Sequence, residues 1–138
     1  MAVQPDRPTL PDALRADLAR AGLEFLAEFY EAALRHRPDN LEALAELAHA
    51  YTRLGWIDRG LAIDRRLVEL EPENPTVHYN LACSLALAGE SEKALDALEH
   101  AAVLGYADAD FLSQDEDLKS VRADARFTRL VERLRQRA

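Results

Sequence analysis

The chain has 138 residues, a length that suits one compact domain with a hydrophobic core of its own. Its 25 acidic residues outnumber 17 basic ones, and the formal net charge of −8 argues against nonspecific binding to nucleic acid or to an anionic membrane surface. The single cysteine, Cys83, excludes an intramolecular disulfide, and no cluster of Cys and His has the spacing of a zinc site.

The sequence also lacks the usual marks of export and membrane insertion. Its first residues have no apolar core of the kind that signal peptides carry. No apolar run approaches the ~18 residues that a membrane-spanning helix needs. We therefore expect a cytoplasmic protein, and the excess of Ala, Leu and Arg over Lys favours a bacterial source.

The N-terminal part of the chain is the least regular. Residues 1–10 contain Pro5 and Pro8 with few apolar residues, which predicts a flexible leader. Helical spacing of apolar residues follows on both sides of Gly22. This glycine is either the turn of a first hairpin or a residue inside one longer helix. We favour the hairpin, and therefore a degenerate first repeat over residues 11–40.

The first well-formed hairpin is predicted over residues 41–74. Asn40 is suited to cap a helix over residues 41–54, and Gly55 is suited to end it. A return helix then runs from about residue 58 to Glu71 and stops before a proline.

Two residues of this return helix depart from the expected pattern. Gly60 costs about 1 kcal/mol inside a helix, and we attribute it to a close helix crossing. Asp64 stands where an apolar residue belongs. It is either buried against Arg65, His78 or Tyr51, or exposed by a rotation of the helix. We favour exposure, because burying an unpaired charge is costly.

The second hairpin is predicted over residues 75–108. Asn74 caps its first helix and Pro75 occupies the first turn, where a missing N–H is harmless. Its apolar residues and its turn glycine repeat those of the preceding hairpin at a period of about 34 residues. The matched positions are Leu47 and Leu81, Ala48 and Ala82, Gly55 and Gly89, Leu61 and Leu95, and Leu70 and Leu104.

This period, with small and large apolar residues at constant phase, resembles that of the tetratricopeptide repeat family. The likeness is strong over residues 41–108 and weak in the flanks. It implies an all-α fold, namely a right-handed α-solenoid of about three helix-turn-helix hairpins that forms a single domain over residues 11–138.

The segment 109–138 resembles a capping segment common in bacterial members of this family. The likeness rests on Gly105-Tyr106-Ala107-Asp108, Asp117-Leu118 and Arg126-Phe127. Capping helices are therefore expected here. The side chains expected to cover the open apolar end of the stack are Phe111, Leu118, Phe127 and Leu130.

The family resemblance implies a noncatalytic scaffold or adaptor without a cofactor or metal, which binds a peptide or a helix of another protein. The partner lies in a concave groove lined by the first helix of each repeat. The groove positions implied in this sequence are Glu42, Ala45, Glu46, His49, Thr52, Arg53, Thr76, Tyr79, Asn80, Cys83 and Leu87. Among them His49, Arg53, Tyr79 and Asn80 form the predicted binding patch, with Tyr79 as its aromatic anchor.

Trp56 is a secondary candidate for partner binding, although packing over the edge of its own repeat is favoured. Cys83 is expected to be a small buried side chain rather than a regulated thiol. The four histidines share no metal-binding motif, and structural roles are favoured for all of them.

Other functions remain as alternatives. The chain has five acids between Asp108 and Asp117 and six arginines from Arg122 onward, so self-association through opposed ends is one of them. An RNA-binding helical repeat is less favoured, because such readers need more repeats and a basic groove. A regulatory subunit of an enzyme is possible, but the chain itself is not expected to be an enzyme, since it has no nucleophile motif, phosphate-binding loop or metal site.

Overall fold

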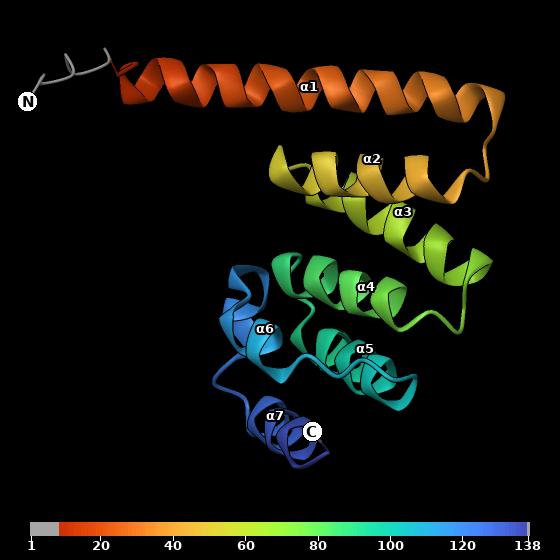
Figure 1. Cartoon of the computed structure of the whole chain (residues 1–138), viewed down its shortest axis with the longest axis vertical. Helices are drawn as coiled ribbons and strands as arrows, with labels where there is room; N and C mark the ends of the chain where they lie inside the picture. Colours follow the sequence, from red (N-terminus) through yellow and green to blue (C-terminus); the bar gives the residue numbers. More distant parts are fainter. Residues whose placement is uncertain (1–8, 138) are drawn as a thin grey trace, which may run out of the picture.

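The computed structural model describes residues 9–137, and every regular element in this range is helical (Figure 1). The elements are α1 (Asp12–His36), α2 (Leu41–Arg53), α3 (Ile57–Leu70), α4 (Pro75–Leu87), α5 (Ser91–Val103), α6 (Ala109–Gln114), the 3₁₀ helix η1 (Glu116–Val121) and α7 (Ala125–Gln136). The prediction of an all-α fold is therefore confirmed. The expected leader, residues 1–10, lies almost wholly outside the described residues.

The two predicted hairpins are α2–α3 and α4–α5. Asn40 Oδ1 accepts a hydrogen bond from the backbone N–H of Ala43 at 3.0 Å and so caps α2. Asn74 caps α4 in the same way. Gly55 and Gly89 turn each hairpin with φ of 82° and 81°, a region in which residues with a Cβ are strained. The capping asparagines and the turn glycines thus lie at the ends of these helices, close to the predicted bounds.

Consecutive helices pack side by side down the stack, and small residues allow the closest approaches (Figure 1). Ala82 of α4 and Ala94 of α5 are both fully buried. A Cβ on Gly60 would lie 2.7 Å from Thr52 Oγ1 and 3.3 Å from the backbone oxygen of Ala48. The prediction that Gly60 marks a close helix crossing is therefore confirmed.

The N-terminal region is one helix, so the favoured turn at Gly22 is wrong. Helix α1 continues through Gly22, and the neighbouring Ala, Leu and Glu residues have high helix propensity. A single interior glycine costs only about 1 kcal/mol, which such neighbours offset. The C-terminal half of α1 packs on α2 through Leu23, Ala27, Tyr30 and Leu34. Figure 1 shows its other half extending past the end of α2.

The C-terminal segment covers the far end of the stack, as expected. Leu118, Phe127 and Leu130 are buried there. Phe111 was expected beside them, and this prediction is wrong, because its side chain is 54% exposed. Asp108 caps α6 by accepting a hydrogen bond from the backbone N–H of Phe111. With α6 beginning at this point, Leu112 rather than Phe111 lies on the inner face of the helix.

Candidate protein-binding groove

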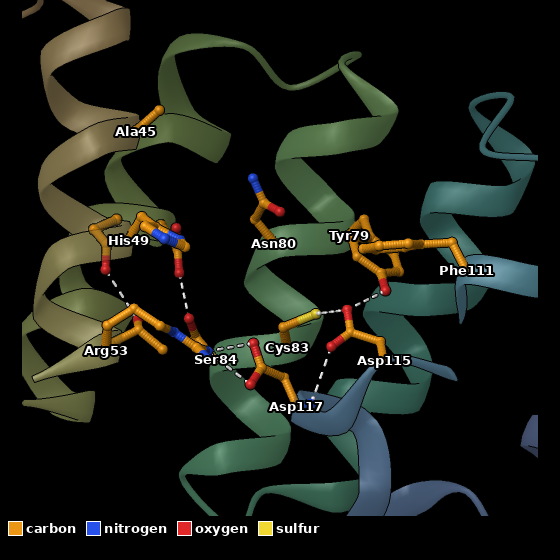
Figure 2. A pocket seen from close by; sticks show the side chains of 13 residues that line it. Ala45, His49, Arg53, Tyr79, Asn80, Cys83, Ser84, Phe111, Asp115 and Asp117 are labelled. Atoms are coloured by element: carbon orange, nitrogen blue, oxygen red, sulfur yellow. Dashed lines mark hydrogen bonds and ion pairs between the residues drawn. The ribbon is translucent and has the colours of Figure 1, made fainter. Parts of the chain in front are cut away.

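A cleft of about 270 Å³ lies between α2, α4 and the segment that joins α6 to η1 (Figure 2). Each of these three elements contributes side chains to its wall. The lining residues are Ala45, Ala48, His49, Thr52 and Arg53 of α2, Asp64 of α3, Tyr79, Asn80, Cys83 and Ser84 of α4, and Phe111, Asp115 and Asp117 of the C-terminal segment. The cleft thus occupies the face where the family resemblance places a partner.

Most of the predicted groove residues meet in this cleft. Those that line it are Ala45, His49, Thr52, Arg53, Tyr79, Asn80 and Cys83. The remaining ones, Glu42, Glu46, Thr76 and Leu87, are exposed on the same helices but do not line it. That these residues bind a partner stays a prediction.

Tyr79 is not the exposed anchor that the sequence predicted. Its side chain is only 4% exposed, and its ring stacks on that of Tyr106 with centroids 4.4 Å apart. The hydroxyl donates to Asp115 Oδ2 at 2.5 Å, and burial is the main reason that the pKa of Tyr79 is raised. Tyr79 therefore forms part of the wall. The exposed aromatic ring of the cleft is Phe111, 6.0 Å from Tyr79 between ring centroids (Figure 2).

Arg53 is held in the cleft by an acid from the C-terminal segment. Its Nη2 lies 2.7 Å from both carboxylate oxygens of Asp117, and this hydrogen bonding is the main cause of its raised pKa. The arginine side chain is 42% exposed, so the pair contributes about 1 kcal/mol or less to stability. Its clearer effect is to fix η1 beside α2.

Asp115 organises the opposite wall. Its Oδ2 accepts from Tyr79, and Cys83 Sγ lies 3.7 Å from the same oxygen. Its Oδ1 accepts from the N–H of Asp117 and so caps η1. The acidic run was considered only for self-association, and this role of Asp115 was not predicted. The sequence allows Asp115 to be recognised as a capping residue, because it directly precedes a short helix. The capping pattern does not predict that Asp115 also contacts α4.

Cys83, Asp115 and Asp117 offer ligand atoms that lie within 4.8 Å of one another, a grouping that could hold a metal ion. The two carboxylates are already engaged by Tyr79 and Arg53. Burial raises the pKa of the Cys83 thiol, which keeps it protonated at neutral pH. These contacts fit a structural cluster better than a metal centre, and Cys83 is a buried side chain as predicted.

Asp64 is buried, so the favoured prediction of exposure is wrong. Its carboxyl accepts a hydrogen bond from the Ser84 hydroxyl where α3 packs on α4. Burial raises the pKa of Asp64 to about 6, and the bond from Ser84 opposes that rise. Its partner, Ser84, was not among the three predicted candidates. The three candidates it named bond elsewhere: Arg65 to Glu90, His78 to the oxygen of Pro72, and Tyr51 to Glu31.

Trp56 lies away from the cleft and packs on its own repeat, as the favoured interpretation predicted. Its ring lies 5.7 Å from that of Tyr51, and the Arg59 guanidinium lies 5.1 Å from its centroid. It is half-buried by these neighbours, which makes it a weaker candidate for partner binding.

Comparison with solved structures finds the same architecture elsewhere. The crystal structure of MamA, a tetratricopeptide repeat protein, superposes with a TM-score of 0.69 at 19% identity over 93% of this chain and 75% of that one. The chain has the solenoid fold of tetratricopeptide repeat proteins. No described helix of this solenoid combines the length and apolar character needed to cross a membrane.

Curated relatives of the solenoid agree with this assignment. It is 33% identical over 75 residues to the CTR9 homologue of Arabidopsis thaliana and 32% identical over 72 residues to Superkiller protein 3 of Saccharomyces cerevisiae, both repeat proteins of this kind. The matches span 54% and 52% of this chain but only 7% and 5% of those proteins. No family model matches the chain. Tetratricopeptide folds generally mediate protein–protein interaction and are generally noncatalytic.

Proposed function

We propose that this solenoid is a noncatalytic adaptor whose cleft binds a short segment of another protein. One observation carries the proposal. Three exposed side chains from separate parts of the cleft, namely His49, Asn80 and Phe111, surround a hollow of about 270 Å³. An exposed aromatic ring beside hydrogen-bonding groups is the composition in which binding energy concentrates.

The charges of the cleft favour a basic segment. Asp64, Asp115 and Asp117 supply three carboxyl groups against the single guanidinium of Arg53, and the chain as a whole carries a net charge of −8. A negative field attracts cationic ligands and makes nucleic acid an unfavourable partner. The segment we propose therefore carries Lys or Arg, and a cytoplasmic location remains part of the proposal.

The size of the cleft limits the affinity. It draws on the first helices of only two full repeats, α2 and α4. A segment of a few residues that gains about 8 kcal/mol on binding has a dissociation constant near 1 μM. The attraction depends on charge, so it weakens as ionic strength shortens the range of the field.

Filling the cleft tests this proposal. Short peptides are selected from a random phage-displayed library on the wild-type protein, and their affinities are measured by fluorescence anisotropy. We expect selected peptides to be rich in Lys and Arg. Replacing Ala45, an exposed residue of the cleft, by Trp should weaken their binding about tenfold or more, because lost contacts worth 1.4 kcal/mol already produce that factor.

The matched control is Ala62→Trp, which adds the same ring to an exposed alanine of α3 away from the cleft. This variant should bind the peptides as the wild type does. Peptides that bind Ala45→Trp and wild type equally, or a library that yields no binder, would exclude the cleft as the binding site.

A further inference from the structure

Helix α1 has two apolar faces, and only one of them is covered. One face packs on α2, whereas the other is a stripe of large apolar side chains that no described residue covers. Leu18, Phe25 and Phe29 are 55%, 67% and 56% exposed. The full stripe consists of Leu14, Leu18, Phe25, Leu26 and Phe29. These positions recur on one side of the helix at spacings of about one or two turns.

The two ends of the solenoid differ in this respect. At the C-terminal end α7 buries Phe127, Leu130 and Leu134 and turns exposed arginines outward. At the N-terminal end the outward face of α1 is the apolar stripe itself. Solenoids need a polar outer face at each end to stay in solution as single chains. The stripe is thus the side of the stack that is left without a cap.

Four residues of the stripe are placed symmetrically about its centre. Leu18 and Phe25 are equidistant from the midpoint between Ala21 and Gly22, and so are Leu14 and Phe29. An antiparallel copy of the same helix would therefore set Leu18 against Phe25 and Leu14 against Phe29. The self-complementary patch is what a twofold interface requires.

The centre of this pattern has the smallest side chains. A Cβ on Gly22 would meet nothing within 4 Å, so no contact inside the chain explains a glycine there. An interior glycine costs about 1 kcal/mol of helix stability. In an antiparallel pair, Ala21 and Gly22 would lie at the crossing, where small residues let two helix backbones approach closely.

We propose that α1 binds α1 of a second copy in an antiparallel pair, with the twofold axis near Ala21 and Gly22. The second copy then supplies the cap that the N-terminal end lacks. Head-to-tail stacking is disfavoured, because the other end presents the arginines of α7 rather than an apolar face.

The available area fits such a dimer. A half-exposed Leu or Phe side chain presents roughly 100 Å². Five of them give roughly 500 Å² per copy, so the pair would bury about 1,000 Å², close to the smallest area expected of a specific interface. The area on one copy is as large as the largest apolar patch that single chains typically expose, and such patches often mark an interaction site. The buried area corresponds to a reversible dimer that dissociates on dilution.

The oligomeric state of the full chain tests the proposal. Sedimentation equilibrium should show a concentration-dependent dimer. The double variant Leu18→Lys and Phe25→Lys should raise its dissociation constant about tenfold or more, because it buries charge at the centre of the interface. The control is Leu87→Lys with Val103→Lys, which adds the same charge at two exposed apolar residues outside the stripe and should leave the dimer unchanged.

All substituted side chains are exposed, and circular dichroism should show that each variant keeps the helical fold. A wild-type chain that stays monomeric, or a dimer that persists in the stripe variant, would overturn the proposal. Loss of the dimer in both the stripe variant and the control variant would also overturn the proposal, because the added positive charge alone would then explain the loss.

Cross-linking distinguishes the antiparallel pair from a parallel one. Chains with Leu18→Cys and chains with Phe25→Cys are mixed and mildly oxidised, both in a Cys83→Ser background. The antiparallel arrangement predicts a disulfide between the two kinds of chain and little within either kind. A parallel arrangement gives the reverse result and would overturn the proposed geometry.

Discussion

The pairing of Asp64 with Ser84 shows how one hydroxyl allows an acid to lie inside a helix contact. A buried carboxylate without a partner costs several kcal/mol, and a hydrogen bond offsets part of that cost. Ser84 is itself buried, at the point where α4 meets α3. The bond does not remove the penalty, because the pKa of Asp64 still lies at about 6. The pair is therefore sensitive to pH.

We predict that Asp64 destabilises the folded state as pH rises. Its pKa is about 6 in the folded chain and 3.8 ordinarily, so below pH 4 it is protonated in both states. Between pH 4 and 6 only the unfolded chain loses the proton, and stability falls by about 3 kcal/mol before levelling off. The advantage of Asp64→Asn over wild type in urea unfolding should widen across that window.

Glu46→Gln is the matched control for this experiment, because Glu46 is an exposed acid in the middle of α2. Its effect on the free energy of unfolding should be small, because substitutions at exposed positions usually change stability by about 0.5 kcal/mol or less. A constant difference between wild type and Asp64→Asn over the same range would contradict the proposed ionisation.

At the scale of the helices, the C-terminal segment combines a cap with a groove wall. Its α7 closes the end of the stack with a buried apolar face, while α6 and η1 line the cleft. Each of the two phenylalanines of this segment belongs to one of these roles. Phe127 is buried in the cap, whereas Phe111 is exposed beside the cleft.

The two residues should therefore respond differently to the same substitution. Phe127→Ala removes a buried ring and leaves a cavity, which should lower the free energy of unfolding by about 3–5 kcal/mol. Phe111→Ala should cost about 1 kcal/mol or less and should weaken binding of the selected peptides. Urea unfolding and anisotropy measure the two effects. Equal destabilisation by both variants would show that Phe111 also supports the fold.

Local sequence patterns predicted the helices well, because the residues that begin or end a helix lie within a few positions of its terminus. Asn40, Gly55 and Asn74 each act where the sequence placed them. The same reasoning failed at Gly22, which resembles a turn glycine but lacks a proline or a capping residue beside it. A lone glycine thus does not distinguish a turn from a helix interior.

The site was only partly predictable. Periodicity placed His49, Arg53 and Asn80 on the concave face, since it fixes which side of a helix each residue occupies. It could not show that Asp115 covers Tyr79, because the fold-back of the C-terminal segment is a long-range contact outside the repeat. The same limit applies to the burial of Asp64, which depends on the neighbouring helix.

At the scale of the molecule, the solenoid has one closed end and one open end. Removing residues 109–138 would open the closed end as well, exposing Leu95, Leu98 and Ala102 of α5. We predict that the shortened chain aggregates or loses several kcal/mol of stability, since each large side chain contributes about 1.5–3 kcal/mol when buried. Light scattering and urea unfolding measure both outcomes. A shortened chain with unchanged stability and mass would show that the segment is dispensable for the fold.

The contact of Arg53 with Asp117 joins residues 64 positions apart, whereas most helices of the solenoid pack on their neighbours in the chain. Local contacts form early, and closing a long loop is slower. During synthesis α2 can therefore pack on α3, and α4 on α5, before the acids at 115 and 117 have left the ribosome. We expect the cleft to be completed last, so the protein becomes competent to bind only after most of it has folded.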